Sequence, residues 1–195
     1  MQSLRNASLM SEPSLLGIKT LLIIGVNLSR TGRAQDASAL FGTIVQLAYA
    51  IDLHHDPDTL MPRPPHPERL SRRSLWWLML YLDQHLSSML YKPLAISSIG
   101  HCSEPETPNA DVLELRVASV VHKFTVIARK ILDRGRQIAT REIDAQLAKL
   151  KTLWETMPDT SRFDTSWLRD KKALPQWPLE VASASESHSN LFEIV

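Results

Sequence analysis

The 195-residue chain contains little cysteine and little glycine. It has one cysteine, Cys102, and six glycines. A single thiol excludes a disulfide framework and any zinc cluster built from several thiolates, and it favours the reducing interior of a cell. The glycines form neither a Gly-x-Gly-x-x-Gly motif nor a phosphate-binding loop, so no motif indicates a nucleotide site.

The chain also lacks an excess of charge of either sign. It has 22 basic and 21 acidic residues, which gives a formal net charge of +1. Proteins that bind nucleic acids on their own usually carry a basic excess, because neutralising phosphates supplies much of their affinity. We therefore expect no direct nucleic-acid binding by this chain alone.

No apolar run is long enough for a membrane span. The most apolar stretch, residues 15–28, contains Lys19 and Asn27 and is shorter than the roughly 20 residues that a spanning helix needs. Residues 1–13 lack the charged-then-apolar profile of a secretory signal. These absences predict a soluble intracellular protein that does not bind membranes.

Five segments have apolar residues at helical spacing, and none shows convincing strand alternation. They span residues 13–29, 36–53, 67–90, 111–135 and 140–158. The fourth is expected to bury Val117, Val121, Phe124, Ile127 and Ile131, and the fifth Ile143, Leu147, Leu150, Trp154 and Met157. The pattern predicts an all-α fold, either a helical bundle or an irregular α-superhelical array of about five helices.

The third segment contains an uninterrupted apolar octet, residues 75–82, with the sequence Leu-Trp-Trp-Leu-Met-Leu-Tyr-Leu. A helix that is apolar on all sides must be surrounded by other elements. The octet is also compatible with a buried strand, but helix-compatible sequence flanks it on both sides, with no turn signal for about twenty residues. We interpret it as the central helix around which the others pack.

Proline marks the irregular segments. Five prolines lie between residues 57 and 67, and three lie between residues 93 and 108. Each removes a backbone donor and restricts the preceding residue, which excludes a helix there. We expect a disordered N-terminus over residues 1–12, a helical domain over residues 13–158, and a loop with a flexible tail over residues 159–195.

The histidines and the cysteine offer candidate chemistry. His54, His55 and Asp56 have the donor types of a metal site. On a helix end, however, neighbouring histidines point about 100° apart, so we interpret them as residues beside the last helical carbonyls. His101 next to Cys102 suggests a thiol nucleophile, but sequence neighbours seldom form the required hydrogen bond. We predict neither a metal site nor a catalytic residue.

Asp83 is an acid within the apolar central helix, where an unpaired charge is costly. We expect it to form a salt bridge or a loop cap with Arg72, Arg73 or Lys92. The alternative is a functional role, as a general base or a ligand contact.

Three arginines, at positions 69, 72 and 73, precede Trp76 and Trp77. Nucleic-acid-binding proteins combine arginines with stacking aromatic side chains in this way. Because the chain has almost no net charge, we interpret the arginines as covering the start of the helix while the tryptophans pack inside.

An ordered set of residues connects the second segment to the second Pro-rich stretch. In order, its members are Leu53, His54, Asp56, Glu68, Arg72, Arg73, Trp76, Trp77, Asp83, Ser87 and Pro93. With these residues the chain resembles the middle homology region of fungal zinc-cluster transcription factors, over roughly residues 15–181. Three places depart from the family pattern: Asp52 replaces a Gly, His55 an Arg, and Tyr91-Lys92 a Gly-Arg pair.

The resemblance implies an α-helical regulatory region that restrains or relays transcriptional activation in the nucleus, in response to a small-molecule effector. Trp76, Trp77 and Tyr81 are the expected lining of an effector pocket, and protein partners or a homodimer are expected. Family members usually carry a six-cysteine zinc cluster that reads DNA, which a chain with one cysteine cannot form. We therefore expect zinc only in that absent module, no cofactor in this chain, and a fragment or truncated form.

Two other functions remain open from the residues alone. One is a helical protein-interaction scaffold or a truncated partner of a full-length regulator, which a large exposed apolar patch would favour. The other is a helical enzyme that uses Asp83 with His54 or His85.

Overall fold

The computed structural model describes residues 13–105, 113–133 and 140–155. Within these ranges the chain forms α-helices and one short 3-10 turn, and it forms no strand, which confirms the all-α prediction. The elements are α2 (Leu15–Arg30), α3 (Ala34–Ala50), η1 (Pro57–Thr59), α4 (His66–Leu90), α5 (Leu113–Asp133) and α6 (Thr140–Glu155). The predicted tail and the expected positions beyond residue 155 lie outside the described residues.

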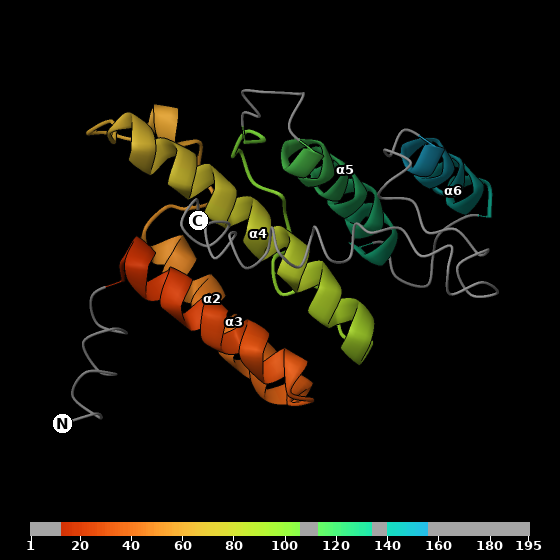
Figure 1. Cartoon of the computed structure of the whole chain (residues 1–195), viewed down its shortest axis with the longest axis horizontal. Helices are drawn as coiled ribbons and strands as arrows, with labels where there is room; N and C mark the ends of the chain where they lie inside the picture. The colour runs from red at the N-terminus through yellow and green to blue at the C-terminus, as the bar shows by residue number, and fades with distance from the viewer. Residues whose placement is uncertain (1–12, 106–112, 134–139, 156–195) are drawn as a thin grey trace, which may run out of the picture.

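The helices form an open array with α4 in its middle (Figure 1). The pair α2 and α3 lies on one side of α4, α5 lies on the other side, and α6 packs on α5. None of the described helices is long and apolar enough to cross a membrane.

The α2–α3 hairpin follows from local signals. Ser14 caps α2, because its hydroxyl accepts a hydrogen bond from the backbone N–H of Gly17 at 3.1 Å. Gly32 adopts a positive φ of 82° in the tight connection to α3, a conformation that glycine adopts without steric cost. Ile18, Leu22 and Phe41 are among the side chains that the hairpin buries.

The central helix α4 contains the predicted octet, and the elements around α4 bury most of it. Leu75, Trp76, Met79 and Leu80 are fully buried, Trp77 is nearly so, and the remaining three are half-buried. Pro67 lies in the first turn, where its missing N–H breaks no helical hydrogen bond. The octet is therefore the buried centre of the array, as its all-round apolar pattern predicts.

The end of α3 differs from the prediction. The helix ends at Ala50, and Asp52 turns the chain with a left-handed φ of 54°. The N–H of Leu53 then donates to the carbonyl of Ala48 at 3.0 Å. His54 and His55 consequently lie on a turn beyond the helix, so the helix-end geometry expected for their imidazoles is wrong.

The buried faces of α5 and α6 also differ from the prediction. In α5, Phe124 is exposed, whereas Thr125 and Arg129 are buried. In α6, Ile143, Leu147 and Trp154 are exposed, and Gln146 and Leu153 are buried. Among the described helices, α6 packs mainly on α5. Because α5 covers only part of the apolar face of α6, the remaining apolar side chains of α6 are exposed. Val117 and Met157, which were also expected to be buried, lie outside the described side chains.

Substituting one leucine on α4 and one on α6 tests which of the two helices contributes more to the hydrophobic core. Leu80→Ala removes a fully buried side chain and should lower the free energy of unfolding by about 2–5 kcal/mol. The matched change Leu147→Ala, at a side chain that is 52% exposed, should change it by less than about 0.5 kcal/mol. Urea unfolding followed by circular dichroism measures both, and equal losses would contradict this placement of the core.

Candidate functional site

Asp83 connects three parts of the fold through one buried carboxylate. Its Oδ1 accepts a hydrogen bond from the N–H of Ala95 at 2.9 Å, and its Oδ2 accepts one from the N–H of Ile96 at 3.0 Å. Oδ2 also pairs with Nη1 of Arg129 on α5 at 2.9 Å. The side chains of Asp83 and Arg129 are only 2% and 4% exposed. The carboxylate thus fixes α5 and the loop after α4 to the central helix.

The partner of Asp83 was not among the three predicted cations. Arg129 comes from α5, and it also donates to the carbonyls of Leu80 and Ile96. Lys92, one of the predicted partners, instead donates to Oε1 of Gln35 at 2.7 Å. Arg129 satisfies the buried charge because it reaches the acid from a neighbouring helix, which spacing along the sequence does not reveal.

Asp56 forms a second connection, between the turn after α3, helix α4 and the far end of the loop. Its Oδ1 pairs with Nη2 of Arg73 at 2.9 Å, and its Oδ2 accepts the N–H of Ser103 at 3.1 Å. Arg73 also pairs with Asp58 in η1. The neighbouring Arg72 donates to the carbonyl of Ile51, so the two arginines hold both sides of this turn.

Three more residues of the predicted set fasten the loop, residues 91–105, along α4. The indole N–H of Trp76 donates to the carbonyl of Ile99 at 2.7 Å, and that of Trp77 donates to the carbonyl of Ser103 at 2.9 Å. The hydroxyl of Ser87 donates to the carbonyl of Pro93 at 3.3 Å. We call Asp56, Trp76, Trp77, Asp83 and Ser87 the anchor residues, because each holds this irregular loop on the central helix.

The other members of the set lie nearby. Leu53 is fully buried, His54 lies on the turn after α3, and Glu68 pairs with Arg72 at 3.6 Å. Sequence reasoning missed Arg129 and the backbone donors of Ala95, Ile96 and Ser103, which carry no side-chain signal.

A cavity of about 210 Å³ lies between α2, α3 and α4. Its walls are mostly apolar, with Leu22, Val26, Phe41, Ile44 and Leu86 among them, and Arg30, Tyr81 and His85 add polar groups. Tyr81 therefore lines this cavity, whereas Trp76 and Trp77 do not and instead point their indole N–H groups at the loop.

The two candidate catalytic groups, the Asp83 carboxylate and the Cys102 thiol, are not arranged for catalysis. Both oxygens of Asp83 accept hydrogen bonds inside the protein, and neither His54 nor His85 is among its hydrogen-bond or ion-pair partners in the described part of the chain. Burial, with a contribution from the charge of Asp56, raises the pKa of the Cys102 thiol to about 12. That thiol stays protonated at neutral pH and is a poor nucleophile.

A family model for the fungal specific transcription factor domain matches residues 3–160. The chain belongs to this family. The match spans most of the 195 residues and confirms the family predicted from the motif residues. The family is a transcription factor domain and not an enzyme family. No curated protein and no solved structure matches the chain.

Two departures of this transcription factor domain from the family pattern have a structural consequence. Asp52 and Tyr91 stand where the pattern has glycine, and they are the two non-glycine residues with positive φ in the described ranges, each at 54°. An aspartate tolerates the left-handed conformation better than most residues, whereas a tyrosine is strained in it. Both positions thus have the positive φ that favours glycine, the residue of the family pattern.

The pKa of Asp56 gives a pH test of the second connection in this domain. Burial alone would raise that pKa, but hydrogen bonds from Ser103, Arg73 and the N–H of Asp58 hold it well below its usual value. A carboxyl with a lowered folded-state pKa stabilises the protein above its unfolded pKa, and this contribution disappears as the pH falls through the folded pKa. Asp56→Asn should therefore lower the free energy of unfolding at pH 7 by about 1.5–3 kcal/mol. The free energy of unfolding of this variant should also fall less steeply than that of the parent as the pH is lowered from about 5 to about 2.

Asp36→Asn is the matched control, because Asp36 forms an exposed pair with Arg33. It should change stability by less than about 1 kcal/mol. Urea unfolding at several pH values measures all three proteins. An Asp56→Asn curve parallel to that of the parent across the acidic range would contradict the role given to the carboxylate.

Proposed function

We propose that this domain is the regulatory region of a fungal transcription factor, acting in the nucleus, and that a small effector bound in the cavity between α2, α3 and α4 sets its state. The observation that carries the proposal is the position of this cavity against α4, whose opposite side holds α5 and the loop. A ligand in this cavity contacts α4, the helix on which the anchor residues hold the loop.

The cavity sets the size and chemistry of the effector. A designed cavity of about 150 Å³ in another protein is known to accept benzene, so about 210 Å³ suits a single ring with a short substituent. The apolar walls favour a hydrophobic body, and Arg30 at the cavity favours an acidic or other electron-rich substituent.

The anchor residues support a relay. Leu82, His85 and Leu86 face the cavity, and Asp83, Gln84 and Ser87 on the same stretch of α4 are buried elsewhere. A shift of this stretch changes the contacts of Asp83 with Arg129 and with the loop. Packed elements respond to small local shifts by repacking as units, which is how a bound molecule alters a distant surface.

DNA reading in this proposal belongs to a separate module, because a sequence with one cysteine cannot form a six-cysteine zinc cluster. The near-neutral charge supports the same division of labour. Regulatory output then passes through protein contacts, either with partners or with a second copy of the chain.

A reporter assay in a fungal cell tests the proposal. The full chain is placed between a heterologous DNA-binding domain and an activation domain. Reporter output should differ from that of a fusion with a flexible linker of equal length. Val26→Phe fills the cavity and should abolish the response to effector or fix the output at one level, whereas Leu147→Phe, on the exposed face of α6, should match the parent.

Two results separate the parts of the proposal. Output equal to that of the linker fusion would contradict the regulatory role. Output that differs from the linker fusion but is unchanged by Val26→Phe would contradict the role of the cavity. Circular dichroism of the purified variants confirms that both still fold.

A further inference from the structure

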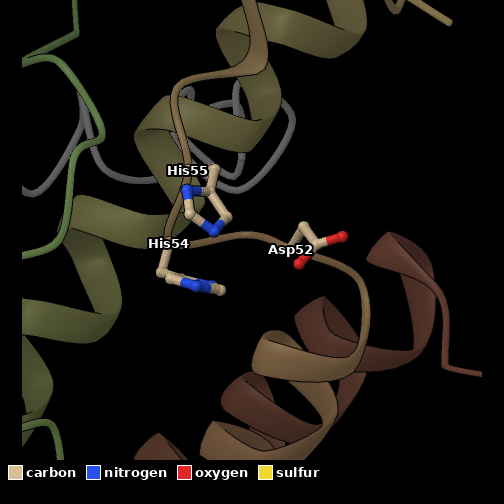
Figure 2. A group of neighbouring side chains, drawn as sticks. All are labelled: Asp52, His54 and His55. Carbon is tan, nitrogen blue, oxygen red and sulfur yellow. The ribbon is translucent and has the colours of Figure 1, made fainter. Parts of the chain in front are cut away.

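The turn after α3 gathers three metal-binding side chains outside the anchor residues and the cavity. Asp52, His54 and His55 each offer one donor atom, and these atoms all lie within 4.8 Å of one another. Figure 2 shows the two imidazole rings and the carboxylate projecting from this short turn. The sequence instead suggested the trio with Asp56, whose carboxylate is occupied by Arg73 and Ser103.

The left-handed backbone at Asp52 produces this arrangement. It ends the helix, and on the irregular turn the rings of His54 and His55 have their centroids 4.0 Å apart. On a helix the same neighbours would point about 100° apart. The backbone conformation thus removes the geometric objection to two adjacent histidines sharing an ion.

The loop after α4 holds the turn in place. The N–H of His101 donates to the carbonyl of His54 at 3.1 Å. Gly100 makes this approach possible, because a Cβ there would lie 2.6 Å from the same carbonyl oxygen. The His101 ring stacks on that of His55, with centroids 6.2 Å apart and an interplanar angle of 12°. A third imidazole, that of His101, therefore lies beside the three donors.

The donor atoms are not committed to other contacts in the described part of the chain. Nδ1 of His54 is buried without a hydrogen-bond partner, and the Asp52 carboxylate forms no hydrogen bond or ion pair there. A buried polar atom without a partner calls for a bound water or ion. Asp52 is exposed, so an ion can reach the cluster from solvent.

We propose that Asp52, His54 and His55 bind one divalent transition-metal ion of the zinc class, with His101 or water completing the coordination. Two imidazoles and one carboxylate suit Zn²⁺, Ni²⁺ or Cu²⁺, whereas Mg²⁺ prefers oxygen ligands alone. Around zinc, ligand atoms at tetrahedral corners lie about 3.4 Å apart. Rotation of the exposed Asp52 side chain and of the half-buried imidazoles would bring the three donors from within 4.8 Å of one another to that distance.

Calorimetric titration of the purified full chain with ZnCl₂, in a buffer that does not coordinate zinc, tests the proposal. The parent should bind one Zn²⁺ at this site and should not bind Mg²⁺ there. Asp52→Asn and His55→Phe should each weaken the binding at least about tenfold. Asparagine tolerates the left-handed backbone, and phenylalanine keeps a ring without nitrogen donors.

His66→Phe is the matched control, because His66 is an exposed histidine at the start of α4 outside the cluster. It should leave Zn²⁺ binding unchanged. The His54 and Trp76 rings have centroids 6.1 Å apart, so Cu²⁺ at the site should quench part of the tryptophan fluorescence in the parent and in His66→Phe. The two cluster variants should need at least about tenfold more Cu²⁺ for the same quenching.

Circular dichroism confirms that each variant folds before titration. The proposal is overturned by an absence of saturable Zn²⁺ binding in the parent. It is equally overturned by binding that either cluster variant leaves at parental affinity, or that the His66 control weakens as much as they do.

Discussion

The buried carboxylate of Asp83 is the interaction on which the arrangement around the central helix depends. Its two oxygens receive two backbone N–H groups of the loop and the guanidinium of Arg129, so one side chain positions three segments. A buried ion pair is weak evidence for stability, since desolvation offsets much of its attraction. Its value here is specificity: an enclosed carboxylate is tolerated only where these partners meet it, which excludes other ways of placing α5 on α4.

The anchors and the cavity give the central helix two different neighbours. On one side, the irregular loop is held by polar contacts to Asp56, Trp76, Trp77, Asp83 and Ser87. On the other side, the α2–α3 hairpin makes an apolar contact that leaves unfilled space. Hydrogen bonds and ion pairs form only in particular geometries, whereas apolar side chains can pack against ligands of several shapes. The relay proposed above depends on this difference between the two sides of α4.

The sequence predicted the fold class, the central helix and the family, because these depend on local apolar spacing and on an ordered motif. The octet at residues 75–82 is enclosed as its composition predicts. The partner of Asp83 and the buried face of α6 escaped prediction, because both depend on which helices become neighbours. The turn at residues 51–55 escaped it for another reason: a left-handed residue at Asp52, where the family pattern has glycine, reorients the side chains that follow.

The most direct test of the account is a double-mutant cycle on Asp83 and Arg129, with Asp83→Asn, Arg129→Met and the double variant compared by urea unfolding. The account predicts that Arg129→Met, which leaves the carboxylate unpaired, costs about 3–5 kcal/mol. The double variant should cost less than the sum of the single losses, by at least about 1 kcal/mol. Losses that add to within about 0.5 kcal/mol would show that the two residues act independently and would contradict the central claim.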